Sequence, residues 1–240
     1  MINMLKLILA VFPVTLLPQS GFDIAEMVHN RYMPKALTNH ARMTLTDSKG
    51  NSRNQAMVIK SADKNKKQII WFLEPRDIRG ISFLKINHQD KNDEMRMWLP
   101  AFKKVRRISA KKKGDSFMGS DLSYEDLSMR NLSNFDYALL QSDIIQNTEC
   151  YVIETTPKPK LISSYQKHIS WIDKTKFIIL REHSYNLNGE LEKKKEYRYS
   201  LIRDYFIVEK VHVTNVITGH KTEILFSNIQ VDTEVDESLF

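Results

Sequence analysis

The sequence is poor in the residues that build covalent and metal cross-links. It has one cysteine, Cys150, so no disulfide can form within the chain. Cys150 lies in the apolar run 149–154, and we expect it to be a small buried side chain. The seven histidines are all more than four residues apart, which excludes a metal clip on one helical turn. His168 and His183 fall on segments expected to be neighbouring strands, so a meeting of these two in space stays open.

Glycine and proline are also scarce, with seven residues of each. The chain has no glycine-rich phosphate loop and no dinucleotide fingerprint, so the common nucleotide-binding sites are not expected. It also has no Pro/Gly/Ser tract, internal repeat or low-complexity segment that would divide it. Pro157 and Pro159 mark a weak boundary, but strand-like segments flank it on both sides. We therefore expect a single domain over residues 21–240.

The most apolar run, residues 7–17, is too short for a comfortable membrane span. It follows Lys6 and ends in small residues, which is the layout of a secretory signal peptide. We expect residues 1–20 to be this signal and the mature chain to begin near Gly21; burial of the run in a core is the alternative. No cysteine precedes residue 150, so we expect no lipid-attachment site after the signal and a soluble exported protein.

The positive charge of the chain is concentrated in one stretch. Residues 103–113 hold seven basic residues and no acid, which equals the net charge of +7 of the whole chain, so the rest sums to zero. These residues, here called the basic patch, are Lys103, Lys104, Arg106, Arg107, Lys111, Lys112 and Lys113. We expect the patch to dock onto an anionic membrane or an acidic partner protein, with a solvated surface as the alternative. Phe102 and Phe117 flank the patch without interleaving in it, so nucleic acid is not an expected partner.

Acidic and small polar residues follow the basic patch. Asp121, Glu125 and Asp126 are expected to pair with the patch or to face water. The run Gly114-Asp-Ser-Phe117 resembles the nucleophile block of the GDSL esterases, but it lies in mid-chain and the sequence has no Asp-x-x-His partner. We interpret Gly114 and Ser116 as turn residues and expect no catalytic residues.

The apolar pattern changes from helical to alternating near residue 36. Residues 22–33 have apolar positions at three- and four-residue spacing, which predicts a short helix favoured at its start by Asp23 and ended by Pro34. From Ala36 onward apolar and polar residues alternate, which predicts antiparallel strands. The expected strands are two around Ala41–Leu45 and Met57–Ile59, followed by 67–73, 81–86, 94–99, 149–156, 167–173, 176–186, 191–200, 205–216 and 221–230.

Turn signals separate these strands, and the middle of the chain differs from the rest. Residues 47–50, Asn188-Gly189 and Thr218-Gly219 predict turns between paired strands. Residues 124–127 and 135–140 have helical spacing in places and predict short helices or turns.

Three blocks between residues 71 and 127 resemble a known family. In order they are Phe72-x-x-Pro75-x-Asp77-x-Arg79-Gly80 with Phe83-Leu84, then Leu99-Pro-Ala-Phe-Lys-Lys-Val-Arg-Arg-Ile108, and Ser116-Phe-Met-Gly-Ser-Asp-Leu-Ser-Tyr-Glu-Asp-Leu127. Together they resemble the outer-membrane lipoprotein-sorting family, relatives of the periplasmic lipoprotein carrier LolA. The resemblance implies a mainly β protein. Its strongly curved antiparallel sheet of about eleven strands would form an unclosed half-barrel, with helices covering the open side.

The resemblance also implies a function. It predicts a periplasmic carrier or chaperone that binds the acyl chains of lipoproteins or lipids in an apolar cavity and delivers them toward the outer membrane. We expect a monomer without cofactor or metal, with an inner-membrane transporter or an outer-membrane acceptor as partner. An accessory or sensor protein of the same fold, working beside a membrane transporter or regulator, is the alternative, and a lipid hydrolase is a weaker one.

The alternating strands supply candidates for the cavity wall. An acyl chain gains about 0.8 kcal/mol per buried methylene, so a wall of apolar side chains is required. The candidates are Met43, Leu45, Met57, Ile59, Ile70, Phe72, Phe83, Met95, Met97 and Leu99. Methionine is frequent among them, and its flexible side chain suits varied ligands. An ordinary packed core is the alternative for each residue, and the sequence leaves open which strand face lines the cavity.

Overall fold

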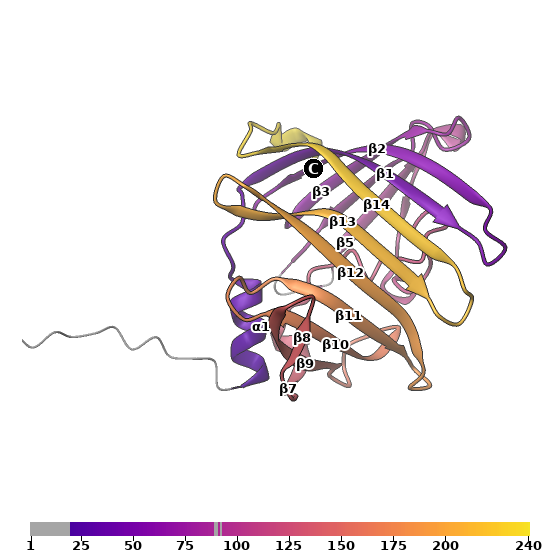
Figure 1. Ribbon diagram of the computed structural model, residues 1–240. Helices are drawn as coiled ribbons and strands as arrows, with labels where there is room; N and C mark the ends of the chain where they lie inside the picture. The colour runs from indigo at the N-terminus through magenta and orange to yellow at the C-terminus, as the bar shows by residue number, and fades with distance from the viewer. Residues whose placement is uncertain (1–19, 89–90, 92) are drawn as a thin grey trace, which may run out of the picture.

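The computed structural model describes residues 20–88, 91 and 93–240, so the expected signal peptide lies outside the described residues apart from its last position. Within these residues a single α-helix precedes fourteen strands, which form one antiparallel sheet (Figure 1). The elements are α1 (Gly21–His29), β1 (Ala36–Thr46), β2 (Ser52–Ala62), β3 (Lys67–Glu74), β4 (Ser82–Ile86), β5 (Glu94–Leu99), β6 (Lys104–Arg107), β7 (Phe135–Leu139), β8 (Asp143–Ile145), β9 (Thr148–Pro157), β10 (Tyr165–Asp173), β11 (Ile179–Asn186), β12 (Leu191–Ile202), β13 (Tyr205–Asn215) and β14 (Lys221–Val231).

The order of the strands leaves the sheet open. It runs β6-β5-β4-β3-β2-β1-β14-β13-β12-β11-β10-β9-β7, with β8 paired to β9, so the first and last long strands meet in the middle. The two ends of this path, β6 and β7, are consecutive in the sequence and are joined by residues 108–134. The expected unclosed antiparallel sheet is confirmed. The expected count of about eleven strands is too low, because β6, β7 and β8 are short additions to the strands that the alternation predicts.

Strong curvature brings distant strands to one core. Met97 on β5 shares a cluster of buried apolar side chains with Val211 and Val213 on β13, although five strands separate β5 from β13 in the sheet. Figure 1 shows β3 and β5 lying behind β13 and β14. The sheet therefore has an inner face that encloses the core and an outer face toward solvent.

The helix α1 packs on the inner face at the β9 end. Ser20 caps it by accepting a hydrogen bond from the backbone N–H of Asp23, whose carboxylate accepts in turn from Ser20. Such a cap stabilises a helix by about 1 kcal/mol. Asp23 is thus the third helical residue rather than the cap itself. Ile24 is fully buried and packs with Ile153 and Ile172 of the sheet.

The predicted turns are confirmed, and one predicted helix is wrong. Gly189 and Gly219 have φ of 80° and 74°, which the tight turns before β12 and β14 require and glycine adopts without strain. Residues 124–127 form a turn, as expected. Residues 135–140, expected to be a helix or turn, instead contain strand β7, because pairing with β9 overrides their local spacing.

Candidate functional site

The ten candidate wall residues lie on one face of five neighbouring strands, β1 to β5. They belong to or border the same apolar cluster, with eight of them buried and Leu45 and Leu99 partly buried. The cluster continues onto β13 and β14 through Val211, Val213 and Ile224. The sequence does not decide which strand face the ten residues share; in the structure all ten lie on the inner face.

This inner face is covered by an irregular segment rather than by a second sheet or a helix. Residues 108–127, here called the plug, place Ile108, Phe117, Leu122 and Tyr124 in the apolar cluster. The ring of Phe117 lies 5.2 Å from that of Phe83 and 5.7 Å from that of Tyr124, measured between centroids. The third block of the family resemblance thus forms the plug, and the wall residues are packed against it.

The middle of the plug is a tight turn held by polar side chains of the sheet. Met118 and Gly119 both have left-handed backbone conformations, with φ of 52° and 80°. The side chain of Gln55 donates to the backbone carbonyl of Met118 at 3.0 Å. Thr222 accepts from the backbone N–H of Asp121 at 2.9 Å and donates to its carboxylate at 2.7 Å. These contacts fix the turn in addition to the packing of Met118 against the apolar cluster.

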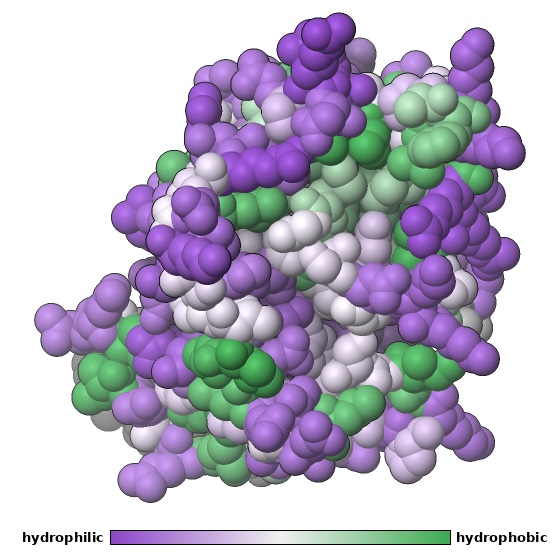
Figure 2. Space-filling view, turned by 90° about the vertical axis from the view of Figure 1, so that its right-hand side faces the viewer, coloured by the Kyte–Doolittle hydropathy of each residue, from purple (hydrophilic) through white to green (hydrophobic). Residues whose placement is uncertain are grey.

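A pocket of about 550 Å³ lies beside this turn. It is lined by plug residues 118, 119 and 121, by the β1–β2 connection, and by apolar Leu45 and Ile78. Figure 2 looks onto this end of the molecule and shows hydrophobic residues reaching the surface between hydrophilic rims. The edge of the apolar cluster is therefore accessible from solvent where the plug turns back.

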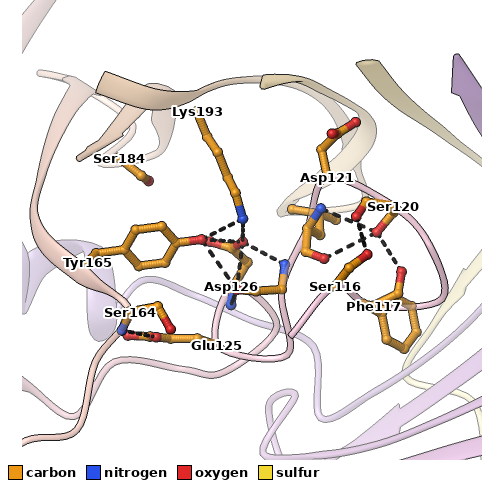
Figure 3. Close-up of polar contacts among 12 residues, drawn as sticks. Ser116, Phe117, Ser120, Asp121, Glu125, Asp126, Ser164, Tyr165, Ser184 and Lys193 are labelled. Carbon is orange, nitrogen blue, oxygen red and sulfur yellow. Dashed lines mark hydrogen bonds and ion pairs between the residues drawn. The ribbon is translucent and has the colours of Figure 1, made fainter. Parts of the chain in front are cut away.

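The C-terminal end of the plug is held by a buried charge. Asp126 is 1 % exposed, and its carboxylate accepts hydrogen bonds from Tyr165 Oη at 2.8 Å and from Lys193 Nζ at 3.2 Å. Lys195 Nζ also donates to it, as do the hydroxyl and backbone N–H of Ser123. Figure 3 shows Tyr165 and Lys193 converging on Asp126 from the sheet. We call Asp126, Tyr165, Lys193 and Lys195 the latch.

Further charges lie behind the latch on the inner face. Lys195 also donates to Glu182 at 3.1 Å, and Arg130 forms a two-pronged pair with Glu182 at 2.6 and 2.9 Å. Ser170 donates to the same carboxylate at 3.0 Å. Strands β10, β11 and β12 therefore carry a polar inner face, whereas β1 to β5, β13 and β14 carry an apolar one.

The ion pairs set the protonation of this region. Burial alone would raise the pKa of Asp126, but the charges of Lys195 and Lys193 outweigh it and hold the pKa far below its ordinary value. Burial likewise raises the pKa of Glu182, but the charge of Arg130 outweighs it, so the pKa lies well below its ordinary value. Burial lowers the pKa of His168, which is therefore neutral near pH 7. The cluster thus contains two carboxylates and three cations.

A third lysine holds the plug from β4. Lys85 is 1 % exposed, and its ammonium group donates to the backbone carbonyl of Leu127 at 2.7 Å. Burial lowers its pKa to about 8, an effect that the charge of Asp93 partly offsets. Asp126 and Leu127, adjacent in the chain, are therefore held by three buried lysines from two distant strands.

The basic patch begins at the sheet edge and runs into the plug, where the backbone carbonyl of Lys113 accepts from the backbone N–H of Glu125 at 2.7 Å. Lys104, Arg106 and Arg107 are exposed along β6, and Lys103 precedes that strand with φ of 47°. Lys111 and Lys112 are exposed on a short 3₁₀ turn. Lys113 is partly buried and pairs with Asp93 at 3.2 Å.

Several polar residues are placed differently from the expectation. The three acids after the basic patch do not pair with it: Asp121 and Asp126 bond the sheet as described, and Glu125 accepts from Ser163 and Ser164 at 2.5 and 2.8 Å. The patch residues other than Lys113 are exposed instead, because the chain turns inward between the two groups.

The candidate reactive residues take structural roles. His168 lies on the inner face and bonds Ser184, whereas His183 packs edge-to-face against Trp171, so the two imidazoles do not meet. Ser116 donates its hydroxyl proton to the carbonyl of Ser120 at 2.5 Å, as expected of a turn residue. Cys150 is fully buried, as expected.

A family profile and several solved structures are similar to this chain. The profile of a family described as "Uncharacterized protein" matches residues 64–240, well over half of the chain. The chain belongs to this family. No curated protein matches the sequence.

The solved structures identify the LolA-like fold. A domain from Vibrio parahaemolyticus, described as an outer membrane lipoprotein-sorting protein domain, is 29% identical, with a TM-score of 0.86, covering 91% of this chain and 94% of its own. A DUF1329 family protein from Desulfovibrio piger is 28% identical, with a TM-score of 0.86, covering 92% and 95%. A LolA superfamily protein from Nitrosomonas europaea is 16% identical, with a TM-score of 0.73, covering 93% and 98%. The resemblance seen in the three sequence blocks is thereby confirmed.

Across residues 20–88, 91 and 93–240, the structure contains no helix with the length and apolar character needed to cross a membrane.

Proposed function

We propose that this LolA-like protein is a periplasmic carrier that shields acyl chains of lipids or lipoproteins on its inner face and delivers them toward the outer membrane. The observation that carries the proposal is the plug: an apolar wall spanning β1 to β5 is covered by a segment that contains neither an α-helix nor a β-strand. The similar lipoprotein-sorting domain supports it. The plug occupies the wall in the empty protein and leaves it when cargo binds.

The energies of plug and cargo are of similar size. Burying the four apolar plug side chains contributes about 6–12 kcal/mol at about 1.5–3 kcal/mol each. A 16-carbon acyl chain with about fourteen methylenes gains about 11 kcal/mol at about 0.8 kcal/mol each. Because the two nearly balance, one can replace the other reversibly, as a carrier requires.

Extraction and transfer test the carrier proposal. Lipid recovered from the purified protein should contain acyl chains, and the delipidated protein should speed the movement of a fluorescent phospholipid from donor to acceptor vesicles. Binding without transfer would favour the accessory or sensor role instead. No bound acyl chain and no transfer would contradict the proposal.

A pair of truncations tests whether the plug competes with cargo. Phe117→Ala should lower the stability of the empty protein by about 3–5 kcal/mol and raise the affinity for the phospholipid, because the displaced packing is weaker. Ile172→Ala, in the separate cluster under α1, should lower stability without raising affinity. Equal effects of both changes on lipid binding would show that the plug is ordinary core.

We also propose that the basic patch docks the carrier on an anionic membrane surface. Exposed apolar side chains accompany the charges: Phe102 is 70% and Val105 60% exposed. Basic residues beside apolar ones suit the interface of an anionic bilayer, where each nearby Lys or Arg contributes about 1 kcal/mol.

A further inference from the structure

The charges of the latch and of the adjoining Glu182 come from two different parts of the chain. Lys193, Lys195 and Glu182 belong to the sheet, whereas Asp126 is brought by the plug. With the plug in place the cluster has three cations and two carboxylates, because Arg130 completes it. Movement of the plug removes the Asp126 carboxylate, which leaves Lys193 without a carboxylate partner among the described residues and Lys195 with Glu182 alone; their side chains are 8% and 2% exposed. Buried cations left without their counter-charge are strongly unfavourable.

The cations adjoin the apolar wall directly. Lys195 lies opposite Val213, and Tyr197 opposite Val211, across the β12–β13 pair. Both valines belong to the apolar cluster, and Tyr197 packs against it. Neighbouring strands are about 4.8 Å apart, so an anionic group at Lys195 is one strand from the hydrocarbon-binding face.

The plug itself has the chemistry of an amphiphile. Its apolar residues Phe117, Leu122 and Tyr124 cover the wall, and the Asp126 carboxylate lies just two residues beyond the last of them. Residues 124–127 form a turn, so this step spans less than the about 7 Å of two extended residues. A ligand that replaces all of these contacts has a hydrocarbon chain and an acidic group close to its start.

We infer that the cargo is an amphiphile with an anionic head group, which takes the place of the Asp126 carboxylate between Lys193, Lys195 and Tyr165. Its oxyanion accepts from the two ammonium groups and from the phenol hydroxyl that Asp126 engages in the empty protein. A fatty-acid carboxylate and the phosphate of an acidic lipid share this chemistry. The inference rests on the proposed function, since the chain of the same molecule lies on the wall.

Matched ligands test the inference. The affinities of the full-length delipidated protein for oleate and for monoolein, which has the same chain and a neutral head, are measured by native mass spectrometry and calorimetry. We expect oleate to bind at least about tenfold more tightly. Equal affinities would overturn the head-group inference while leaving the carrier proposal intact, whereas binding of neither would contradict the carrier proposal itself.

A lysine substitution locates the head group. Lys195→Met keeps most of the apolar stem and leaves Lys193 and Arg130 beside Asp126 and Glu182, so each carboxylate of the empty protein still has one cation as partner. We expect the oleate preference to fall toward equality. Lys194→Met, on the same strand but exposed on the other face, should leave the preference unchanged. A preference unaffected by Lys195→Met would place the head group elsewhere and overturn the inference.

Two further measurements separate the sources of the anion and the role of Asp126. If oleoyl lysophosphatidylglycerol binds more tightly than oleate, the head group is a lipid phosphate. If oleate binds more tightly, the head group is a fatty-acid carboxylate. Either result supports the inference. Inorganic phosphate that stabilises the protein as strongly as oleate would overturn it.

Asp126→Asn should raise the affinities for oleate and monoolein by the same factor, because it weakens the packing of the plug that both ligands displace. Loss of oleate binding alone would contradict displacement of Asp126.

Discussion

At the scale of single residues, three lysines reach the inner face of the sheet without reaching water. Lys85, Lys193 and Lys195 are 1%, 6% and 1% exposed, and all three bind the adjacent plug residues Asp126 and Leu127. Buried lysines are uncommon because desolvation disfavours their charge. Lys195 retains its charge through Asp126 and Glu182, which raise its pKa against the effect of burial. Lys85 has only a carbonyl as its direct partner among the described residues.

Lys85 therefore predicts a specific pH dependence of stability. Its pKa is about 8 in the folded protein, against 10.5 without burial, so between these values the unfolded chain binds a proton that the folded chain does not. The free energy of unfolding should rise with pH across this window, by about 3 kcal/mol in total. The effect of Lys85 is isolated by measuring urea unfolding of the parent and of Lys85→Met from pH 7.5 to 9.5. All other groups titrate in both proteins, so the difference between their free energies of unfolding reports Lys85 alone. The parent should gain stability relative to the variant; parallel curves would mean that Lys85 stays charged.

Single residues also show where sequence reasoning reached its limit. The ten wall residues were found because alternation along each strand separates the two faces, and their burial follows. The latch was not found, because Lys193 and Lys195 lie in the run Glu192–Glu196, where no apolar pattern marks a face. Their partner Asp126 is more than sixty residues away in the sequence. Only the fold brings these charges together.

At the scale of elements, β6 combines the sheet edge with the basic patch. An exposed edge invites pairing with other chains, and charged side chains are a common protection, so this role accounts for the charges by itself. The neighbouring apolar residues are not accounted for in that way. Val105 on β6 lies opposite Trp98 on β5, and Phe102 in the connection between them is exposed. This combination distinguishes a docking edge from a merely protected one.

Vesicle binding tests the docking edge. Replacing Lys103, Lys104, Arg106 and Arg107 with Gln should weaken binding to phosphatidylglycerol vesicles by on the order of 100- to 1000-fold at low salt, since each charge contributes about 1 kcal/mol. The variant should keep the parent's unfolding midpoint. A matched variant carries Gln at Lys49, Lys64, Lys194 and Lys221, which are exposed and scattered. Equal loss in both variants would assign binding to total charge and reject a local docking edge.

At the scale of the whole molecule, the plug is a consequence of topology. The edges β6 and β7 are consecutive in the chain, so the 108–134 connection must cross from one end of the open sheet to the other. It crosses on the inner face and covers it. The sequence predicted the curved open sheet through the family blocks, but expected helices as the cover. The irregular cover was hidden because its apolar residues have no regular period.

Hydrogen exchange with and without lipid tests directly whether cargo displaces the plug. The amide of Asp121 donates to Thr222 of the sheet, and that of Phe117 to the carbonyl of Leu122 within the plug. On addition of oleoyl lysophosphatidylglycerol below its micelle concentration, peptides covering residues 114–127 should exchange faster, while those covering β1, β2 and β13 keep or gain protection. Unchanged or slower exchange in the plug, with lipid demonstrably bound, would mean that the lipid binds outside a closed core and would contradict the account.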